Sequence, residues 1–450
     1  MSDFKTLLFD SIDQHASDVV NLLCDLINHK PLNLGSRGSG QEFATQTWLK
    51  EYLANAGFEN VDSWAVDPEK KRPNVVAVLK GAGGGNSLVF NGHVDVVPVH
   101  DFQGHRWTVD PWSATVKDGS VYGRGASDML GGIAAMVWAA KAILDHGRKL
   151  KGDLFVESVV GEESGENHLG TKACIDRGYT APFAIIGEPT KGEIQPVTCG
   201  TFMFDITVTG KDIHTSMKNL TMYPQRYGIP HGSDVGVDAI AKGIKYMNAF
   251  RELEANWGFR WRHPVLGGGG QPVPWAREGV GAFSITPALI DGGTYFGSIA
   301  GYCKMTCQVY YPSWITAKQA WQEIKEAIAA VSVTDDWLKN NPPTLRVDRF
   351  LEGDEEYFLW EPNEVSMDHE GCKTLASAWK QATGRDAVFS GFNAVCDATV
   401  FGKAGVPATI FGPGDLSTGV HGPDERIAIK DLIDCCKAYA AMAIDWCGLV

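Results

Sequence analysis

The sequence predicts an α/β fold, in which a three-layer domain with a largely parallel sheet is interrupted by a smaller α+β domain. Two observations predict it. Helix-like and strand-like segments alternate over residues 1–197 and again over 353–450, which is typical of a sheet layered between helices. Residues 198–352 instead follow the order strand, helix, strand, strand, helix, strand. That order is the ferredoxin-like arrangement.

Composition narrows the class of protein. The 450 residues are 44% hydrophobic and 21% charged, as in globular proteins. A net charge of −14 argues against nucleic acid as a partner, because binding to phosphates relies on clustered Lys and Arg. Uninterrupted apolar stretches stay well below about 18 residues, so we expect no membrane span. The N-terminus lacks the pattern of a signal peptide, and ten scattered cysteines suit reduced thiols in a cytoplasmic enzyme.

The predicted elements of the larger domain follow from apolar periodicity. Helices are expected over Phe4–Asn28, Gln41–Ala56, Leu130–Asp145, Gly170–Arg177, Asn363–Thr383 and Asp397–Ala404, and from Lys430 onward. Strands are expected over Asn74–Leu79, Leu88–Asn91, Leu154–Val160 and Phe183–Ile186, with further apolar segments at "DAVFSG" and "VPATIFGPG".

The elements of the inserted domain are read in the same way. The segment "TFMFDITVTG" alternates like a half-buried strand. The predicted elements after it are the helix Val235–Leu253, the strands Val280–Ile290 and Tyr302–Tyr311, the helix Ala317–Val331 and the strand Thr344–Phe350.

Acids and histidines follow the apolar strands of the larger domain. In "LVFNGHVDVVP", His93 and Asp95 are two residues apart and so face the same side of an extended chain. Such a pair suits an imidazole that ligates a metal while a carboxylate holds its other nitrogen. An ordinary hydrogen-bonded histidine remains an alternative for this pair taken alone.

Acidic residues and a histidine stand at similar positions further along the chain. Asp128 stands at the turn before a helix, where Asp is also a common N-cap. Glu162 and Glu163 end the strand in "VVGEESG", Glu188 follows the strand in "FAIIGEPT", and His421 lies in a Gly-rich loop after a fourth strand. Because ligands bind at the carboxyl ends of strands in open α/β sheets, we expect these side chains to converge. Their number exceeds what one catalytic zinc needs and suits two metals sharing a carboxylate.

The ordered segments "NGHVDVVP", "GRGASDMLGG", "GEESG", "IGEPT" and "FGPG…HGPDE" resemble the motifs of the zinc aminoacylase and carboxypeptidase family. This family includes acetylornithine deacetylase, succinyl-diaminopimelate desuccinylase and glutamate carboxypeptidase. The resemblance extends from His93 to His421 and includes the inserted domain, which it implies to be a lid through which two chains form a homodimer.

The resemblance also implies the role of each residue. His93 and Glu188 would hold one metal, Glu163 and His421 the other, and Asp128 would bridge them. Two further roles are implied: Asp95 would orient His93, and Glu162 would act as general acid/base toward a hydroxide shared by the metals. The family often has a cis peptide after the bridging aspartate, here Asp128–Met129. The implied cofactors are two divalent ions, zinc first, with cobalt or manganese as alternatives.

Further residues are assigned by the same resemblance. In "VTGKDIHTSM", His214 would reach the active site of a partner chain and polarise the scissile carbonyl, and His231 is a rival for that role. Near the pocket, Asp397 matches a family aspartate, and Gly391 and Asn393 would contact substrate.

The sequence departs from the family pattern in the strand "YCKMTCQVYYP". Cys307 and Val309 stand where relatives carry an Asp and an Arg that help to recognise a substrate carboxylate or to steady the lid. The unassigned cations Lys211, Arg226 and Arg262 are candidates to substitute for them. This departure puts in doubt a simple transfer of substrate specificity from the named relatives.

The expected function is a di-metal amidohydrolase that cleaves the amide bond of an N-acyl amino acid or a related small carboxylate. A metallo-dipeptidase or carboxypeptidase using the same site is the alternative. A non-hydrolytic metal or amino-acid binding protein is a third hypothesis, against which the complete set of ligands and the base argue.

Overall fold

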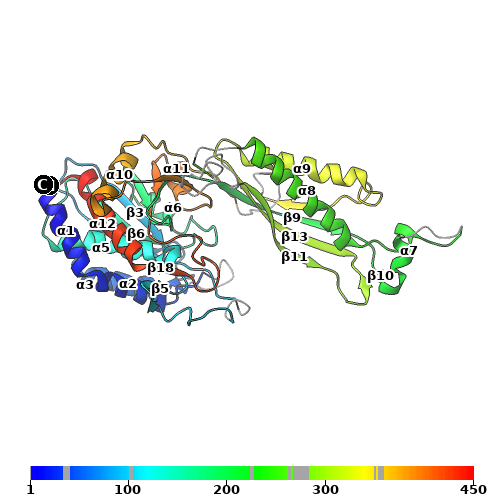
Figure 1. Cartoon of the computed structure of the whole chain (residues 1–450), viewed down its shortest axis with the longest axis horizontal. Coiled ribbons are helices and arrows are strands. Elements are labelled where there is room, and N and C mark those ends of the chain that lie inside the picture. Colours follow the sequence, from blue (N-terminus) through cyan, green and yellow to red (C-terminus); the bar gives the residue numbers. More distant parts are fainter. Residues whose placement is uncertain are drawn as a thin grey trace. The chain divides into compact units, whose positions relative to one another are not determined.

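The computed structural model describes residues 2–33, 41–100, 105–222, 228–261, 265–266, 283–348, 351–352 and 359–450. These residues form two compact units (Figure 1). Unit 1 comprises Met1–Thr198 and Asn363–Val450, and unit 2 comprises Cys199–Pro362. The second unit is therefore inserted into the first in sequence, and each is described by itself.

An eight-stranded sheet runs through unit 1 in the order β1-β2-β6-β3-β7-β17-β8-β16. The central strands β6, β3, β7 and β17 are parallel neighbours, as are β8 and β16. Strand β2 runs antiparallel to both of its neighbours, β1 and β6, and β8 runs antiparallel to β17. The bounds are β1 Asn60–Ala65, β2 Pro73–Leu79, β3 Leu88–His93, β6 Leu154–Val159, β7 Ala184–Ile186, β8 Ile194–Thr198, β16 Phe389–Phe392 and β17 Ala408–Ile410.

Helices cover both faces of this sheet, as the predicted three-layer fold requires. Because strand residues alternate between faces, Leu88 and Phe90 of β3 pack in one apolar cluster and Val89 in another. The larger cluster lies under α1 Ser2–Gln14, α2 Ala16–Asn28, α3 Glu42–Asn55, α5 Gly131–Asp145, α10 Glu370–Thr383 and α12 Ile429–Cys447 (Figure 1). The smaller cluster lies under α6 Thr171–Asp176 and α11 Ala398–Lys403.

Helix α5 occupies the centre of the larger apolar layer. Within the described residues, the stretch Ala126–Asp145 is long and apolar enough to cross a membrane, but 83% of its most apolar window is buried. Burial on nearly all sides is typical of a core helix. The turn Ala126–Leu130 that precedes α5 contains a cis peptide between Asp128 and Met129, as the family resemblance implies.

Unit 2 has the predicted ferredoxin-like topology. Its elements are β9 Gly200–Thr209, α8 Ala239–Arg260, β11 Ser284–Gly292, β13 Tyr302–Tyr311, α9 Ala317–Thr334 and β14 Thr344–Val347. The sheet order is β11-β13-β9-β14, with β15 Leu359–Trp360 also pairing with β9. Side chains start both helices: Asp238 caps α8, and Thr316 forms a capping box with Gln319 at α9.

Several elements differ from the sequence-based prediction. The single helix expected over Phe4–Asn28 breaks at His15, whose backbone leaves helical geometry at φ −103 and ψ 20. Helix α10 begins at Glu370 rather than at Asn363, because the residues before it bond to β8: Asn363 accepts from Thr198 N, and Val365 donates to Pro196 O. The edge strand β1 and a small sheet were not expected; that sheet comprises β4 Thr115–Lys117, β5 Ser120–Tyr122 and β18 Arg426–Ala428.

Unit 2 also contains further short elements. They are β10 Ile213–His214, β12 Ser298–Ile299 and α7 Lys218–Met222 in unit 2. None of the ten cysteines forms a disulfide, and nine of them are buried, as expected for reduced core thiols.

Close approach of α5 to the β7 loop generates a prediction. A Cβ added at Gly132 would lie 2.1 Å from the carbonyl oxygen of Gly187, whereas a Cβ at Gly258 in α8 would meet nothing within 4 Å. Gly132→Ala should therefore destabilise the protein by about 1–3 kcal/mol, because backbone must move beside Glu188. The matched Gly258→Ala should stabilise it by up to about 1 kcal/mol. Denaturant unfolding of both variants checks this, and equal effects of the two substitutions would contradict it.

Candidate metal centre

The five predicted metal ligands lie at one edge of the sheet in unit 1. His93 ends β3, and Glu163 and Glu188 follow β6 and β7 in their loops. Asp128 lies in the turn before α5, and His421 lies in the loop between β17 and β18. The strands β6, β3, β7 and β17 are adjacent and parallel, so their carboxyl ends meet there.

Distances between these side chains define two half-sites around Asp128. His93 Nε2 lies 3.2 Å from Asp128 Oδ1 and 3.5 Å from Glu188 Oε1. His421 Nε2 lies 3.5 Å from Asp128 Oδ2 and 3.2 Å from Glu163 Oε1. Each oxygen of Asp128 thus faces one histidine, which is the arrangement of a bridging carboxylate.

The same distances test whether the residues suit metal ions. Two ligands of a tetrahedral zinc, each about 2.0–2.1 Å from the ion, are about 3.3–3.4 Å apart. The four nitrogen–oxygen separations of 3.2 to 3.5 Å match that value. Ligand atoms of His93, Asp128 and Glu163 also lie within 4.8 Å of one another. The residues therefore fit a pair of divalent ions.

The charges at the site also favour the binding of divalent ions. Burial raises the pKa of Glu162 well above its ordinary value and that of Glu188 to about 8, and neighbouring carboxylates add to both shifts. Burial opposes protonation of the two histidines, but the surrounding carboxylates outweigh it and raise the pKa of His93 and of His421. Burial alone would raise the pKa of Asp128, but hydrogen bonds from both histidines lower it. Excess buried negative charge of this kind is relieved by cations.

Asp95 contacts His93 in a different way from the one expected. His93 Nδ1 lies 2.8 Å from the carbonyl oxygen of Asp95 and 3.9 Å from its carboxylate. The carboxylate instead accepts hydrogen bonds from Gly161 N at 2.9 Å and Glu163 N at 3.2 Å. Asp95 thus contacts the imidazole most closely through its carbonyl oxygen, and its carboxylate holds the loop of Glu162 and Glu163. Its role in orienting His93 stays a prediction.

A second network, which sequence reasoning missed, holds the far end of that loop. Ser164 and Arg72 both donate to Glu166, at 2.7 and 2.6 Å, and Arg72 also pairs with the buried Glu42 at 2.7 Å. Since Arg72 and Glu42 are 4% and 0% exposed, this ion pair lies in the interior. The sequence does not single out Arg72, because it directly follows the charged residues Glu69, Lys70 and Lys71.

Asp397 is buried in unit 1. It is 2% exposed, and its Oδ2 accepts a hydrogen bond from Thr171 at 2.7 Å. Thr171 and Glu157 are both bonded to Asn91, so two buried carboxyl groups belong to one polar cluster beneath His93. Burial raises the pKa of Glu157 to about 8 and of Asp397 to about 6. Asp397 thus belongs to a buried polar cluster, and its contact with substrate stays a prediction.

The other two residues predicted to contact substrate differ in their exposure to solvent. Gly391 is buried in β16, whereas Asn393 beyond the strand end is exposed. In unit 2, His214 and His231 are both exposed; His214 Nδ1 lies 2.8 Å from Ser216 Oγ. Lys211 donates to the carbonyl oxygen of Asp234 at 2.5 Å. The remaining candidate cations, Arg226 and Arg262, lie outside the described residues.

Cys307 and Val309, the two departures from the family pattern, lie in the core of unit 2. Both belong to β13 and are fully buried. Their partners across the sheet are Phe204 and Phe202 of β9. The Asp and Arg of the family pattern are thus replaced by residues that contribute only apolar packing.

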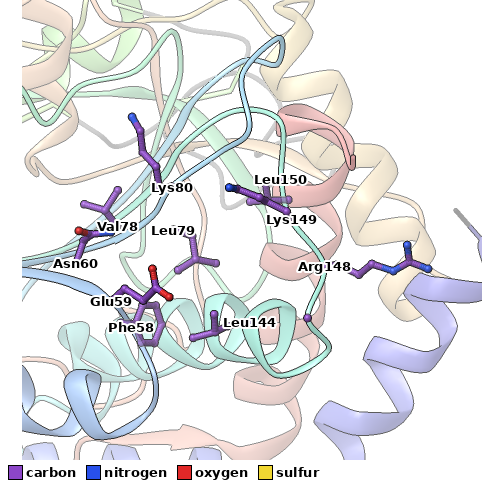
Figure 2. Close-up of a pocket in the computed structure, with 11 residues that line it drawn as sticks. Phe58, Glu59, Asn60, Val78, Leu79, Lys80, Leu144, Arg148, Lys149 and Leu150 are labelled. Carbon is purple, nitrogen blue, oxygen red and sulfur yellow. The ribbon is translucent and has the colours of Figure 1, made fainter.

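A cavity of about 290 Å³ occupies the opposite edge of the unit 1 sheet (Figure 2). Leu79 of β2 and Leu144 of α5 line it, with the cations Lys80 and Arg148 at its margin (Figure 2). Because Leu79 pairs with Leu154 at the start of β6, this cavity lies at the amino ends of the central strands, away from the metal ligands.

The fold and the site together define a class of protein, the metallohydrolases with a two-metal centre at the edge of an α/β sheet. Residues 89–445 match the model of peptidase family M20/M25/M40. The chain belongs to this family, as predicted, and it is accordingly a hydrolase of amide bonds.

Known relatives support this placement over nearly the whole length. The chain is 30% identical over 447 residues to an N-formyl-4-amino-5-aminomethyl-2-methylpyrimidine deformylase of Halalkalibacterium halodurans, covering 98% of this chain and 97% of the relative. It is 26% identical over 434 residues to a succinyl-diaminopimelate desuccinylase of Gluconobacter oxydans, covering 94% and 96%. Among solved structures, human carnosine dipeptidase 1 has the same fold, with a TM-score of 0.72, 16% identity and 98% of each chain covered.

Proposed function

We propose that this chain is a two-metal amidohydrolase that removes a short acyl group, formyl in the first place, from the amine of a small molecule. The observation that carries the proposal is the pair of half-sites that share Asp128, with Glu162 beside them. The relatives at 30% identity, from Halalkalibacterium halodurans and Bacillus subtilis, are both named as deformylases of an aminomethylpyrimidine. The desuccinylase relative is more distant at 26%.

The ligand set supports two divalent ions, with zinc as the first choice. His93 and Glu188 would hold one ion and Glu163 and His421 the other, with Asp128 between them. Imidazole and carboxylate ligands suit zinc, while cobalt and manganese accept similar sets. When bound, such ions polarise the carbonyl of the amide and lower the pKa of an attacking water.

Glu162 is the residue that we assign to proton transfer. It adjoins the ligand Glu163, and burial raises the pKa of its carboxylate, with further increases from Glu188 and Glu163. A carboxylate with a raised pKa is a better base at neutral pH than an ordinary one and readily returns the proton. Glu162 would accept a proton from the attacking water and deliver it to the leaving amine.

The core position of Cys307 and Val309 favours an amine that carries no carboxylate. The family resemblance implies an Asp and an Arg at these places, which would help to recognise a substrate carboxylate or to steady the lid. Here both side chains are fully buried and uncharged in unit 2. An N-formyl aminomethylpyrimidine has no carboxylate that would need such a contact. An N-acyl amino acid is the second candidate, supported by the desuccinylase relative.

A comparison of the adjacent glutamates tests the assigned roles. Glu163→Ala should lower metal affinity by about 10-fold or more, because it removes a ligand of one ion. Glu162→Ala should bind both ions as the wild type does but lose about 10²–10⁴-fold in kcat, because it removes the proton acceptor. Metal analysis with steady-state kinetics measures both. Near-normal turnover of a metal-loaded Glu162→Ala protein would refute the assignment.

A substrate panel tests the chemical class. The metal-loaded protein should cleave N-formyl aminomethylpyrimidine with kcat/KM at least about 10-fold above N-acetylornithine, N-succinyl-diaminopimelate and carnosine, a difference of about 1.4 kcal/mol. Amine release is followed by liquid chromatography, and metal-free protein serves as the blank. Preference for the succinyl or acetyl substrate would select the amino-acid deacylase, and preference for carnosine would select the dipeptidase.

We also propose that two chains form a dimer through unit 2, with His214 serving the partner's site. Exposed apolar residues support this: Ile244 on α8 is 49% exposed, and Leu289 and Ile290 on the edge strand β11 are 66% and 60% exposed. An apolar edge strand is a ready surface for pairing.

A charge placed on that strand tests the dimer. Leu289→Asp should give a monomer by light scattering, because a desolvated charge opposes association. Activity should fall with it, since His214 would no longer reach a partner. The control is Val333→Asp, at a residue of α9 that is 70% exposed. A Leu289→Asp protein that remains dimeric would show that another surface is used.

A further inference from the structure

Arg124 and Glu425 form a buried ion pair beside the metal centre that none of the assigned roles uses. Each side chain is 1% exposed, and the guanidinium lies 2.5 Å from Glu425 Oε2. The two residues are 301 positions apart in the sequence. Arg124 follows β5, and Glu425 directly precedes β18, which pairs with β5. The pair therefore lies where the loop of Asp128 meets the loop of His421.

Glu425 holds the main chain at the bridging aspartate. Its Oε1 accepts hydrogen bonds from Ser127 N and Asp128 N, both at 3.1 Å. Its own carbonyl oxygen accepts from Gly123 N at 2.9 Å. One buried carboxylate thus fixes the backbone from which Asp128 extends.

Arg124 extends the same contact to the other loop. Besides Glu425, it donates to the carbonyl oxygen of Gly422 at 3.2 Å, directly after His421. The backbone of His421 and of Asp424 is left-handed, with φ of 58 and 56. Non-glycine residues keep such conformations where surrounding contacts over-determine them. The contacts of Arg124 are of that kind.

Neighbouring side chains cover the pair. The guanidinium of Arg124 lies 5.5 Å from the ring of Trp107, and Thr108 donates to Asp424 at 2.7 Å through its backbone nitrogen. A buried ion pair by itself is weak evidence for stability, because desolvation offsets the attraction. The hydrogen bonds from this pair to both metal-ligating loops explain the buried ion pair better than a contribution to stability does.

We propose that the Arg124–Glu425 pair is a positioning clamp that fixes the separation of Asp128 and His421. The clamp thereby sets the affinity of the second metal ion, which is the ion held by Glu163 and His421. His93 and Glu188 extend from β3 and the β7 loop, and no bond described above joins the clamp to them. The ion between Glu163 and His421 therefore depends on the clamp more than the ion at His93. The proposal rests on the two-metal site of the proposed function but not on any substrate.

The decisive variant is Glu425→Gln. It preserves shape but places an amide donor against Arg124 or against the backbone nitrogens. The folded variant should keep one ion per chain and bind the second about 10–100-fold more weakly, the usual effect of losing a partner behind a metal ligand. Zinc content after gel filtration and chelator competition for each ion measure this without an activity assay. The cobalt-loaded protein gives an absorption spectrum as an independent readout of geometry.

Two further variants separate positioning from general stability. Asp335→Asn removes a carboxylate in unit 2 that is 3% exposed and held by Lys242 and Lys245. It should lower the melting temperature of the metal-free protein while leaving both metal affinities unchanged. Arg124→Lys retains the charge opposite Glu425 but loses the planar fork that reaches Gly422. It should weaken the second ion less than Glu425→Gln and keeps the proposal testable if that variant does not fold.

The outcomes that overturn the proposal are specific. Two ions bound with wild-type affinity by folded Glu425→Gln or by Arg124→Lys would reduce the pair to a structural contact. Equal weakening of both ions would likewise refute a clamp that acts on the second one. A wild-type chain that binds fewer than two ions would overturn this proposal together with the two-metal site. Normal binding of two ions without hydrolysis of any amide would overturn the proposed function alone.

Discussion

The rest of the site depends on the way in which Asp128 faces two histidines, one with each carboxylate oxygen. The carboxylates of Glu162, Glu163 and Glu188, which follow neighbouring strands, lie in the same site. Because these groups are buried, their combined negative charge is unfavourable and raises their pKa values. A protein without cations would have to hold protons there instead, as the raised pKa values of His93 and His421 indicate. Metal uptake must then displace protons, so affinity should weaken as the pH falls.

Several carboxylates that are not assigned as metal ligands stabilise the metal centre, because they accept hydrogen bonds from the backbone of the loops that carry the ligands. Asp95 accepts from backbone nitrogens in the Glu162 loop, and Glu425 accepts from those at Asp128. Glu166, bonded to Arg72 and Ser164, restrains the same loop as Asp95. These backbone contacts matter because the position of a metal-ligating side chain depends on the position of its Cα atom as well as on its rotamer. The precision of a metal site of this kind therefore rests on a layer of acids behind the ligands.

The sequence predicted the fold well, and it predicted that the candidate ligands converge at one edge of the sheet, because both depend on local signals. His93 and Glu188 follow apolar strands directly, and parallel strands place such residues together. Spacing could not tell whether Asp95 would use its carboxylate or its carbonyl oxygen, since both lie near the same imidazole. It could not give the depth of Asp397, which depends on helices from other parts of the chain. The Arg124–Glu425 pair joins segments 301 positions apart, where no periodic pattern exists.

Substrate choice has to be encoded outside the ligand set. Relatives named as deformylase and desuccinylase align over almost the whole chain, and the fold is shared with a dipeptidase. The ligands and Glu162 act on the amide group, which all these substrates contain. Discrimination must therefore come from residues that meet the acyl group or the amine. The proposed function assigns one such change to Cys307 and Val309, which stand where the family resemblance implies a charged pair, because an apolar core position cannot recognise a carboxylate. Asn393, exposed beyond the end of β16, is a position in unit 1 from which a polar amine could be recognised instead.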